Sequence, residues 1–232
     1  MSVEIISKIV MKKKCLEIGG PSHSTFMDIC PVYKLAKTVD NVIFSKDTVW
    51  HKSGSLYNYH PGKNGKVFIG EGTNLQEIEN NSYDIILSSH SLEHMANPLQ
   101  GVKEWLRVLK PKGYIILVLP DKNNTFDHKR DVTKFEVLKD KFDRQVGEND
   151  LSCLPEILEK HDLIMDPPAG TLEQFTNRSL KNYENRCLHH HVFDFSLLKQ
   201  ISDFFNCKYI SQQLYQPFHQ YVVIEKNDIY SI

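Results

Sequence analysis

The stretch that decides the fold consists of three pieces: Asp84-Ile-Ile-Leu-Ser88, an amphipathic segment from Ser91 to Leu109, and Tyr114-Ile-Ile-Leu-Val-Leu119. The first and third pieces are short apolar runs of the length expected for buried strands. The middle piece places apolar residues three and four positions apart, which is typical of an amphipathic helix, and Pro98 should interrupt this helix or begin its main part. A strand, a helix and a strand in this order predict two parallel strands joined by a crossover helix.

The same alternation continues on both sides of this stretch. Further strands are predicted at 14–20, 38–44, 66–70, 208–214 and 220–225, and helices at 26–37, where Pro31 should break or reposition the helix, and at 196–205; residues 52–66 are predicted to be a loop. We therefore predict an α/β, Rossmann-like fold with a mostly parallel, seven-stranded sheet and helices on both faces.

The alternation is interrupted after Pro120. Residues 121–188 are polar and charged, with helical patterns near 135–143 and 154–161. We expect one domain spanning 1–232, in which 121–190 form a helical insertion or cap on the substrate side of the sheet.

Composition narrows the functional classes. The 232 residues carry a formal net charge of −1, which disfavours nucleic acid as a partner. Five scattered cysteines without a CxxC pair favour a reducing compartment. The first 14 residues do not resemble a secretory signal and no apolar run is long enough to span a bilayer. We expect a cytoplasmic protein without a membrane span, and no motif indicates an oligomeric state.

A glycine turn follows the first predicted strand. Gly19 and Gly20 would let the backbone approach a ligand closely, and Glu17 could accept from a ligand amine. The alternative is a purely structural strand-to-helix turn. A dinucleotide site requires G-x-G-x-x-G, and this chain continues with Pro21, Ser22 and His23, so that pattern does not fit. Asp40 is placed where an acidic residue would meet ribose hydroxyls, or it is a solvated turn residue.

Residues 83–120 resemble the second half of class I S-adenosylmethionine-dependent methyltransferases, and more narrowly the "type 11" family. The residues that carry the resemblance are the Ser-Ser-His-Ser-Leu-Glu-His94 run, then Asn97-Pro98, then Arg107-Val-Leu-Lys-Pro-Lys-Gly113 before the apolar strand. The resemblance implies S-adenosylmethionine as cofactor and S-adenosylhomocysteine as product. It implies a cofactor site in which the methionine end meets Glu17, Gly19, Gly20 and Pro21, and the ribose meets Asp40. In the same site the adenine meets Glu71 and Gly72, and the sulfonium meets Ser88, Ser89 and His90. The sequence departs from the family pattern at Pro21 and His23, which stand where the family has its second and third glycines.

Candidate catalytic residues come from two segments. His90 directly follows a predicted strand and is placed to act as a base near the methyl group, although a backbone-bonding loop histidine is the alternative. Within the Asp121–Thr133 segment, the run Thr125-Phe-Asp-His-Lys-Arg130 resembles a subset of these methyltransferases associated with surface-polysaccharide synthesis. It offers Asp127 and His128 to the reaction unless the segment is only a solvated charged loop. Substrate contacts are expected from Asp121, Lys129, Arg130 and His191.

The remaining histidines and acids suggest structural roles. We expect Glu93 and His94 to anchor the helix that contains them. His189 and His191, with Asp127 or His128, could form a metal site, but structural histidines fit the pattern better and no metal is expected.

The favoured function is O-methylation of a small polar acceptor, such as a sugar, a nucleotide sugar or a phosphate-bearing glycan precursor. Three alternatives stay open: an S-adenosylmethionine-binding regulatory protein without turnover, a methyltransferase for another small metabolite, and a nicotinamide oxidoreductase of similar fold.

Overall fold

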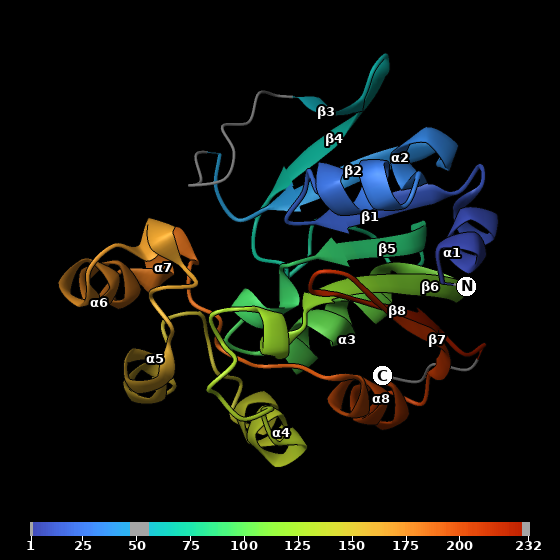
Figure 1. Cartoon of the computed structure of the whole chain (residues 1–232). Helices are drawn as coiled ribbons and strands as arrows, with labels where there is room; N and C mark the ends of the chain where they lie inside the picture. Colours follow the sequence, from blue (N-terminus) through green and yellow to red (C-terminus); the bar gives the residue numbers. More distant parts are fainter. Residues whose placement is uncertain (1, 47–55, 229–232) are drawn as a thin grey trace.

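The computed structural model describes residues 2–46 and 56–228, and its centre is a twisted sheet (Figure 1). The strands follow the order β3-β4-β2-β1-β5-β6-β8-β7. Their bounds are β1 Lys14–Ile18, β2 Thr38–Ile43, β3 Leu56–His60, β4 Lys63–Ile69, β5 Tyr83–Ser89, β6 Leu109–Pro120, β7 Lys208–Tyr215 and β8 His219–Glu225.

The strands β4, β2, β1, β5 and β6 run parallel, while β3, β8 and β7 are antiparallel to their neighbours. This arrangement confirms the prediction of an α/β, Rossmann-like fold with a mostly parallel sheet. The sheet of the described residues has eight strands where seven were predicted. The carboxyl ends of the five parallel strands meet at one edge, which is the edge where open α/β sheets bind ligands.

The additional strand, β3, lies in a segment that was predicted to be a loop. Its residues 56–60 form a hairpin with β4 through the two-residue turn Pro61-Gly62, and residues 52–55 of the predicted loop lie outside the described residues. Tyr57 and Tyr59 point inward and are buried, which gives the strand an alternating pattern. Only one polar residue, Asn58, separates these tyrosines, and the exposed Leu56 precedes them, so the alternation is weak in the sequence.

Helices cover both faces of the sheet, as predicted (Figure 1). One face packs against α1 Ser2–Val10, the π-helical turn η1 Ser24–Ile29 and α2 Val32–Leu35. The helix predicted at 26–37 is thus divided in two at Pro31, whose ring cannot continue a helix. The other face packs against α3 Pro98–Val108 and α8 Phe195–Phe204. Pro98 begins α3, and the side chain of Asn97 caps it by accepting from Gln100 N at 3.2 Å.

The insertion lies beyond the carboxyl ends of the strands, at the left of Figure 1. It has a small core of its own, centred on Leu154, Ile157 and Phe175. Its helices at 135–143 and 154–160 agree with the predicted ones, whereas α6 and α7 were not predicted. Its elements are η3 Lys122–Asn124, α4 Phe135–Asp143, α5 Leu154–Lys160, η4 Pro167–Ala169, α6 Leu172–Leu180 and α7 Asn182–Asn185, and η2 Leu92–His94 lies between β5 and α3.

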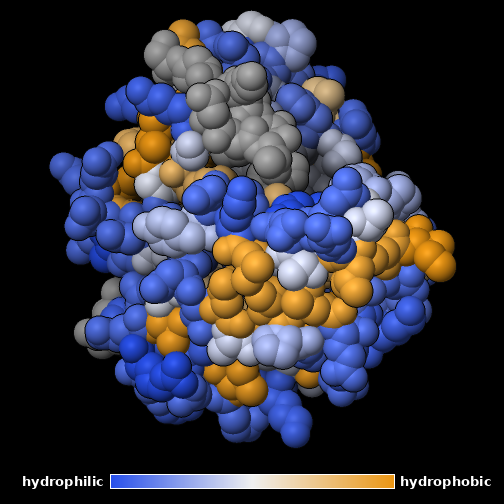
Figure 2. Space-filling view, turned by 90° about the vertical axis from the view of Figure 1, so that its left-hand side faces the viewer, coloured by the Kyte–Doolittle hydropathy of each residue, from blue (hydrophilic) through white to orange (hydrophobic). Residues whose placement is uncertain are grey.

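The side of the molecule on which the insertion lies carries an apolar band at its surface (Figure 2). Large apolar side chains that the insertion exposes to solvent include Ile164, Met165, Leu172, Leu180 and Tyr183. Within the described residues, no helix is both long and apolar enough to cross a membrane.

Candidate functional site

The turn after β1 is organised around a buried carboxylate. The side chain of Glu17 is fully buried, and it accepts hydrogen bonds from the Tyr33 hydroxyl at 2.8 Å, from the Tyr57 hydroxyl and from Ser22 N at 3.2 Å. Burial raises the pKa of Glu17, and the hydrogen bonds from the two tyrosines act against that rise. A Cβ on Gly20 would lie 2.3 Å from the carboxyl carbon of Glu17, so only glycine fits there. Glu17 therefore stabilises the turn from inside the protein.

Gly19 joins this turn to the loop after β5. Its φ of +83° lies in the left-handed region, and a Cβ there would come within 2.3 Å of Ser91 Oγ. Ser91 Oγ in turn donates to the Ile18 carbonyl at 2.9 Å. Gly20, which precedes Pro21 through a cis peptide bond, exchanges two hydrogen bonds with the Asn41 side chain. The backbone of the predicted motif thus lies at the carboxyl edge between β1 and β5.

Asp40 does not lie at that edge. It lies in the middle of β2 and is buried, and its carboxylate accepts from Lys66 N at 2.8 Å and from the Tyr83 hydroxyl at 2.8 Å. Both partners belong to neighbouring parts of the sheet. Asp40 therefore stabilises the sheet rather than occupying the ribose position that was expected of it.

Glu71 and Gly72 follow β4 at the carboxyl edge, as the resemblance implied. The Glu71 carboxylate pairs with Arg186 from the end of α7, whose guanidinium lies 5.2 Å from the ring centre of Phe44. The Gly72 carbonyl accepts from Trp105 Nε1 at 2.9 Å. The insertion thus reaches the end of β2 and the loop after β4 through one arginine.

Three candidate residues end β5. Ser88 Oγ is buried and has no hydrogen-bond partner among the residues that the structure describes, and Ser89 Oγ accepts from Thr25 Oγ1 at 2.9 Å. His90 follows with a φ of +49°, and its backbone N–H donates to the Val118 carbonyl.

Both nitrogens of His90 have neighbours. Nε2 lies 2.9 Å from His219 Nδ1, and Nδ1 lies 3.4 Å from an oxygen of the buried Glu93 carboxylate. Burial and the nearby His90 lower the pKa of His219 to about 4, so its ring is neutral at neutral pH. His219 begins β8, which is antiparallel to β6, so the first residues of β8 lie at the carboxyl edge. His219 was not among the residues predicted from the sequence, although the direction of a last antiparallel strand would have indicated it.

The predicted Asp127–Arg130 cluster is divided between two sites. Asp127 and Arg130 are buried and hydrogen-bonded to each other at 2.9 Å, and Asp127 also lies 2.6 Å from His189 Nδ1. His128 and Lys129 instead pair with the Asp162 carboxylate of the insertion, at 2.8 and 3.0 Å. The structure therefore does not bring His128 and Asp127 together as a catalytic pair.

Arg130 cannot serve as the predicted anion-binding residue. Its guanidinium is held by Asp127 and donates to the carbonyls of His189 and His190 at 2.8 and 3.3 Å. Burial raises the pKa of Asp127, but His189 and Arg130 outweigh it and hold that pKa at about 2. Arg130 therefore fixes the 189–190 backbone.

Two further predicted substrate residues have structural partners. His191 is buried with Nε2 3.2 Å from the Ala96 carbonyl. Asp121, at the carboxyl end of β6, caps η3 by accepting from Asn123 N at 3.3 Å. His191 lies inside the protein, whereas Asp121 stays at the rim of the edge.

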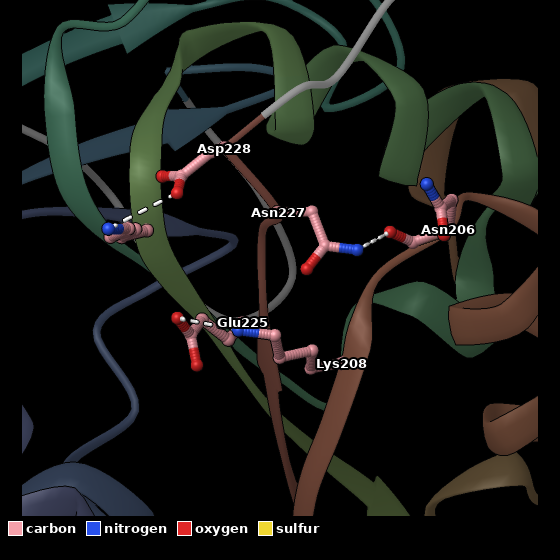
Figure 3. A pocket seen from close by; sticks show the side chains of 6 residues that line it. Asn206, Lys208, Glu225, Asn227 and Asp228 are labelled. Atoms are coloured by element: carbon pink, nitrogen blue, oxygen red, sulfur yellow. Dashed lines mark hydrogen bonds and ion pairs between the residues drawn. The ribbon is translucent and has the colours of Figure 1, made fainter.

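A polar pocket elsewhere is separate from this site (Figure 3). Glu225 pairs with Tyr114, so the pocket lies at the amino end of the parallel part of β6, opposite the carboxyl edge. Its charged side chains pair with one another, Lys112 with Asp228 at 3.1 Å and Lys208 with Glu225 at 3.7 Å. Its lining residues are Lys112, Asn206, Lys208, Glu225, Asn227 and Asp228.

The carboxyl edge has the features that a nucleoside-linked amino acid requires. The turn at Gly19 exposes backbone without a side chain, a Cβ on Gly70 would meet nothing within 4 Å, and Ser88 Oγ is a buried hydroxyl without a partner in the described structure. These three features lie at the ends of β1, β4 and β5, which is where such a ligand crosses an open α/β sheet. S-adenosylmethionine therefore fits the residues at this edge.

Comparison with known proteins agrees with this geometry. Residues 46–117 match the model of a family described as "Methyltransferase domain". The chain is an S-adenosylmethionine-dependent methyltransferase. No curated protein matches the chain in sequence.

Solved structures share the fold of this methyltransferase. A SAM-dependent methyltransferase from Methanosarcina mazei is 14% identical with a TM-score of 0.57, and the match covers 96% of this chain and 97% of that one. A putative S-adenosylmethionine-dependent methyltransferase from Listeria monocytogenes is 13% identical with a TM-score of 0.55, covering 97% and 95%. A SAM-dependent methyltransferase from Aquifex aeolicus is 13% identical with a TM-score of 0.54, covering 97% and 87%. At these identities the likeness shows a shared fold alone.

Proposed function

We propose that the methyltransferase methylates a hydroxyl group of a small polar acceptor, such as a sugar, a nucleotide sugar or a phosphate-bearing glycan precursor. The observation that carries this proposal is the contact of His90 with both His219 and the buried Glu93 at the end of β5. A hydroxyl must lose its proton when it is methylated, whereas a phosphate or carboxylate acceptor needs no base. A histidine pair backed by a carboxylate supplies that base.

The reaction is an in-line displacement. Bound S-adenosylmethionine supplies the activated methyl group. Attack by the acceptor oxygen forms the C–O bond while the C–S bond breaks and its electron pair goes to sulfur. The hydroxyl proton passes to the His90–His219 pair, and the Glu93 carboxylate balances the imidazolium charge. Such a base contributes about 10²–10⁴-fold, and alignment of the reacting atoms contributes about 7–11 kcal/mol.

The cofactor is proposed to lie along the carboxyl edge. In this proposal the turn at Gly19, Gly20 and Pro21 meets the methionine end, Glu71 and Gly72 lie beside the adenine, and Ser88, Ser89 and His90 lie beside the sulfonium. Ser88 supports it most directly, because its buried hydroxyl lacks a partner in the described structure. Glu17, which was expected to accept from the ligand amine, supports the turn instead, because its carboxylate is fully buried and bonded to Tyr33 and Tyr57. Asp40 is left out because its carboxylate is bonded within the sheet.

The acceptor is proposed to bind between this edge and the insertion. Asp121 lies at the rim and remains available to a polar acceptor. Lys129 is about half exposed but pairs with Asp162, so it would have to leave that pair to contact the acceptor. A role in surface-polysaccharide synthesis, a cytoplasmic location and the absence of nucleic-acid substrates complete the proposal. The formal net charge of −1 supports the last point.

A turnover screen with labelled S-adenosylmethionine tests the function. The panel contains sugars, nucleotide sugars, phosphorylated metabolites and, for contrast, primary amines. We expect methyl transfer to a hydroxylated member. Transfer to amines alone would contradict the proposal, and tight binding of S-adenosylhomocysteine without any turnover would favour a regulatory protein.

Two variants test the proton acceptor. His90→Asn should lower kcat by about 10²–10⁴-fold, because asparagine tolerates the left-handed backbone of this position but cannot act as the base. His60→Asn, on β3, removes an imidazole elsewhere and should leave kcat unchanged. Calorimetry with S-adenosylhomocysteine reports whether each variant keeps the cofactor site. An unchanged kcat in His90→Asn would refute the role of His90.

A further inference from the structure

We propose that Glu93, His94 and His189 form a binding site for one divalent transition-metal ion. One ligand atom from each of the three side chains lies within 4.8 Å of the other two. Glu93 and His94 belong to η2, directly after β5, and His189 belongs to the extended segment after α7. The site therefore joins the sheet edge to the end of the insertion.

The Glu93 carboxylate lacks the partners that a buried charge requires. Its side chain is about 1% exposed, and neither of its oxygens makes a hydrogen bond to the residues that the structure describes. The nearest basic atom in an ion pair with it is His90 Nδ1, at 3.4 Å. Burying an ionised carboxylate without hydrogen bonds is costly, and coordination to a cation offsets that cost. A carboxylate has two oxygens. One oxygen of Glu93 can therefore stay near His90 while the other binds an ion.

The two imidazoles are oriented as metal ligands usually are. His189 Nδ1 lies 2.6 Å from the Asp127 carboxylate, and His94 Nδ1 lies 3.1 Å from the Leu188 carbonyl. Both oxygens can only accept, so each Nδ1 carries a proton, and each Nε2 offers its lone pair to an ion when it carries no proton. A carboxylate or carbonyl that accepts from the second nitrogen is the typical support of a metal-bound histidine.

Neighbouring side chains hold the two histidine ligands in place. Arg130 binds both Asp127 and the His189 carbonyl, at 2.9 and 2.8 Å, which fixes the support and the ligand together. The rings of His94 and His189 are 4.7 Å apart between centroids and lie at 83° to each other, so they do not stack. The ring of Phe126 contacts His189 at 4.7 Å between centroids.

Two imidazoles and one carboxylate determine the class of ion. This ligand set suits zinc and the neighbouring first-row divalent ions and leaves at least one coordination position for water or another oxygen ligand. Ligands at about 2.0–2.2 Å from a tetrahedral ion are about 3.4 Å apart, so a gap of at most 4.8 Å closes with small side-chain movements. No metal was expected from the sequence. The histidines that were paired there as candidate ligands included His191, which is bonded to the Ala96 carbonyl instead.

Metal binding by the wild-type protein is the first test, and it requires neither acceptor nor cofactor. Tag-free protein is treated with a chelator, and then Zn²⁺ binding is followed by calorimetry and Co²⁺ binding by visible absorption. We expect one ion per chain, a Co²⁺ spectrum of nitrogen and oxygen ligands in a four- or five-coordinate site, and a higher Tm with Zn²⁺. Failure to bind either ion at millimolar concentration would overturn the proposal, as would a thiolate-to-cobalt band, which would locate the ion at a cysteine.

Variants then locate the ion. Glu93→Gln and His189→Asn should each weaken Zn²⁺ binding at least 100-fold, and Asp127→Asn should weaken it about 10–100-fold because it removes the support of His189. Glu93→Gln should also lose the increase in Tm with Zn²⁺. His60→Asn is the matched control and should bind Zn²⁺ as the wild type does. Wild-type affinity in both Glu93→Gln and His189→Asn would overturn the proposal, whatever the acceptor of the enzyme is.

Discussion

Arg130→Met separates a structural role from the anion-binding role that the sequence predicts for this arginine. The guanidinium is 2% exposed and its partner Asp127 is 4% exposed, so the pair is removed from water. Methionine keeps much of the length of arginine but leaves the Asp127 carboxylate with His189 as its remaining charged partner. It also leaves the carbonyls of His189 and His190 without their donor.

The expected loss follows from that burial. Removing one member of a buried ion pair costs about 3–5 kcal/mol, because the remaining charge stays buried without compensation. For a protein of this size, each kcal/mol lowers Tm by about 2–4 °C, so Tm should decrease by about 6–20 °C. Arg144→Met is the matched control: Arg144 pairs with Asp140 on the exposed face of α4, and the free energy of unfolding should change by less than about 0.5 kcal/mol.

Urea unfolding followed by circular dichroism measures the loss, and amide hydrogen exchange at residues 189–192 locates it. We expect faster exchange there in Arg130→Met than in the wild type or in Arg144→Met. If Arg130 instead bound an anionic acceptor, the variant would raise KM with little change in stability. A loss below about 1 kcal/mol would therefore refute the structural role.

Two further predictions concern buried charges elsewhere. Tyr57→Phe removes one hydroxyl from the buried Glu17 carboxylate and leaves Tyr33 in place, which should cost about 1–3 kcal/mol in urea unfolding; an unchanged midpoint would contradict the role of Tyr57. For Asp150, which pairs with the buried Lys141, burial raises the pKa, but the Lys141 hydrogen bond and its charge outweigh it and lower that pKa from 3.8 to about 2. Because the pKa is lower in the folded state, the contribution of Asp150 to stability is present above pH 3.8 and is lost as pH falls to about 2. Urea midpoints measured between these pH values should fall more steeply in the wild type than in Asp150→Asn, and equal slopes would disprove this assignment.

Much of the fold could be predicted because its signals are local. The apolar runs of β5 and β6 are continuous where these strands are buried on both faces, and the run of β1 is interrupted by the buried Glu17. Pro31 and Pro98 mark helix boundaries, because a proline ring cannot continue a helix but fits its first turn. The strand β3 was missed because only its tyrosines are buried, and half-buried strands at an edge give a weak pattern.

The candidate site was less predictable because its side chains have distant partners. His90 contacts His219 across 129 positions of the chain, and His189 contacts Asp127 across 62. His90 was predicted from the sequence but His219 was not. Asp127 was grouped with His128, but His128 contacts the Asp162 carboxylate instead. Spacing along the chain does not report which side of a loop each residue faces.

The sequence by itself determined the order of strands and helices, the glycine turn after β1 and the resemblance to a methyltransferase. These depend on periodicity and on short motifs, whose physical causes are backbone geometry and burial. Only the tertiary structure decided that Arg130 is buried while Lys129 stays at the surface, and that Glu93 and His189 face each other. The reason is that the folding of the insertion onto the sheet edge, rather than local sequence, sets which charges are removed from water and which partners they meet.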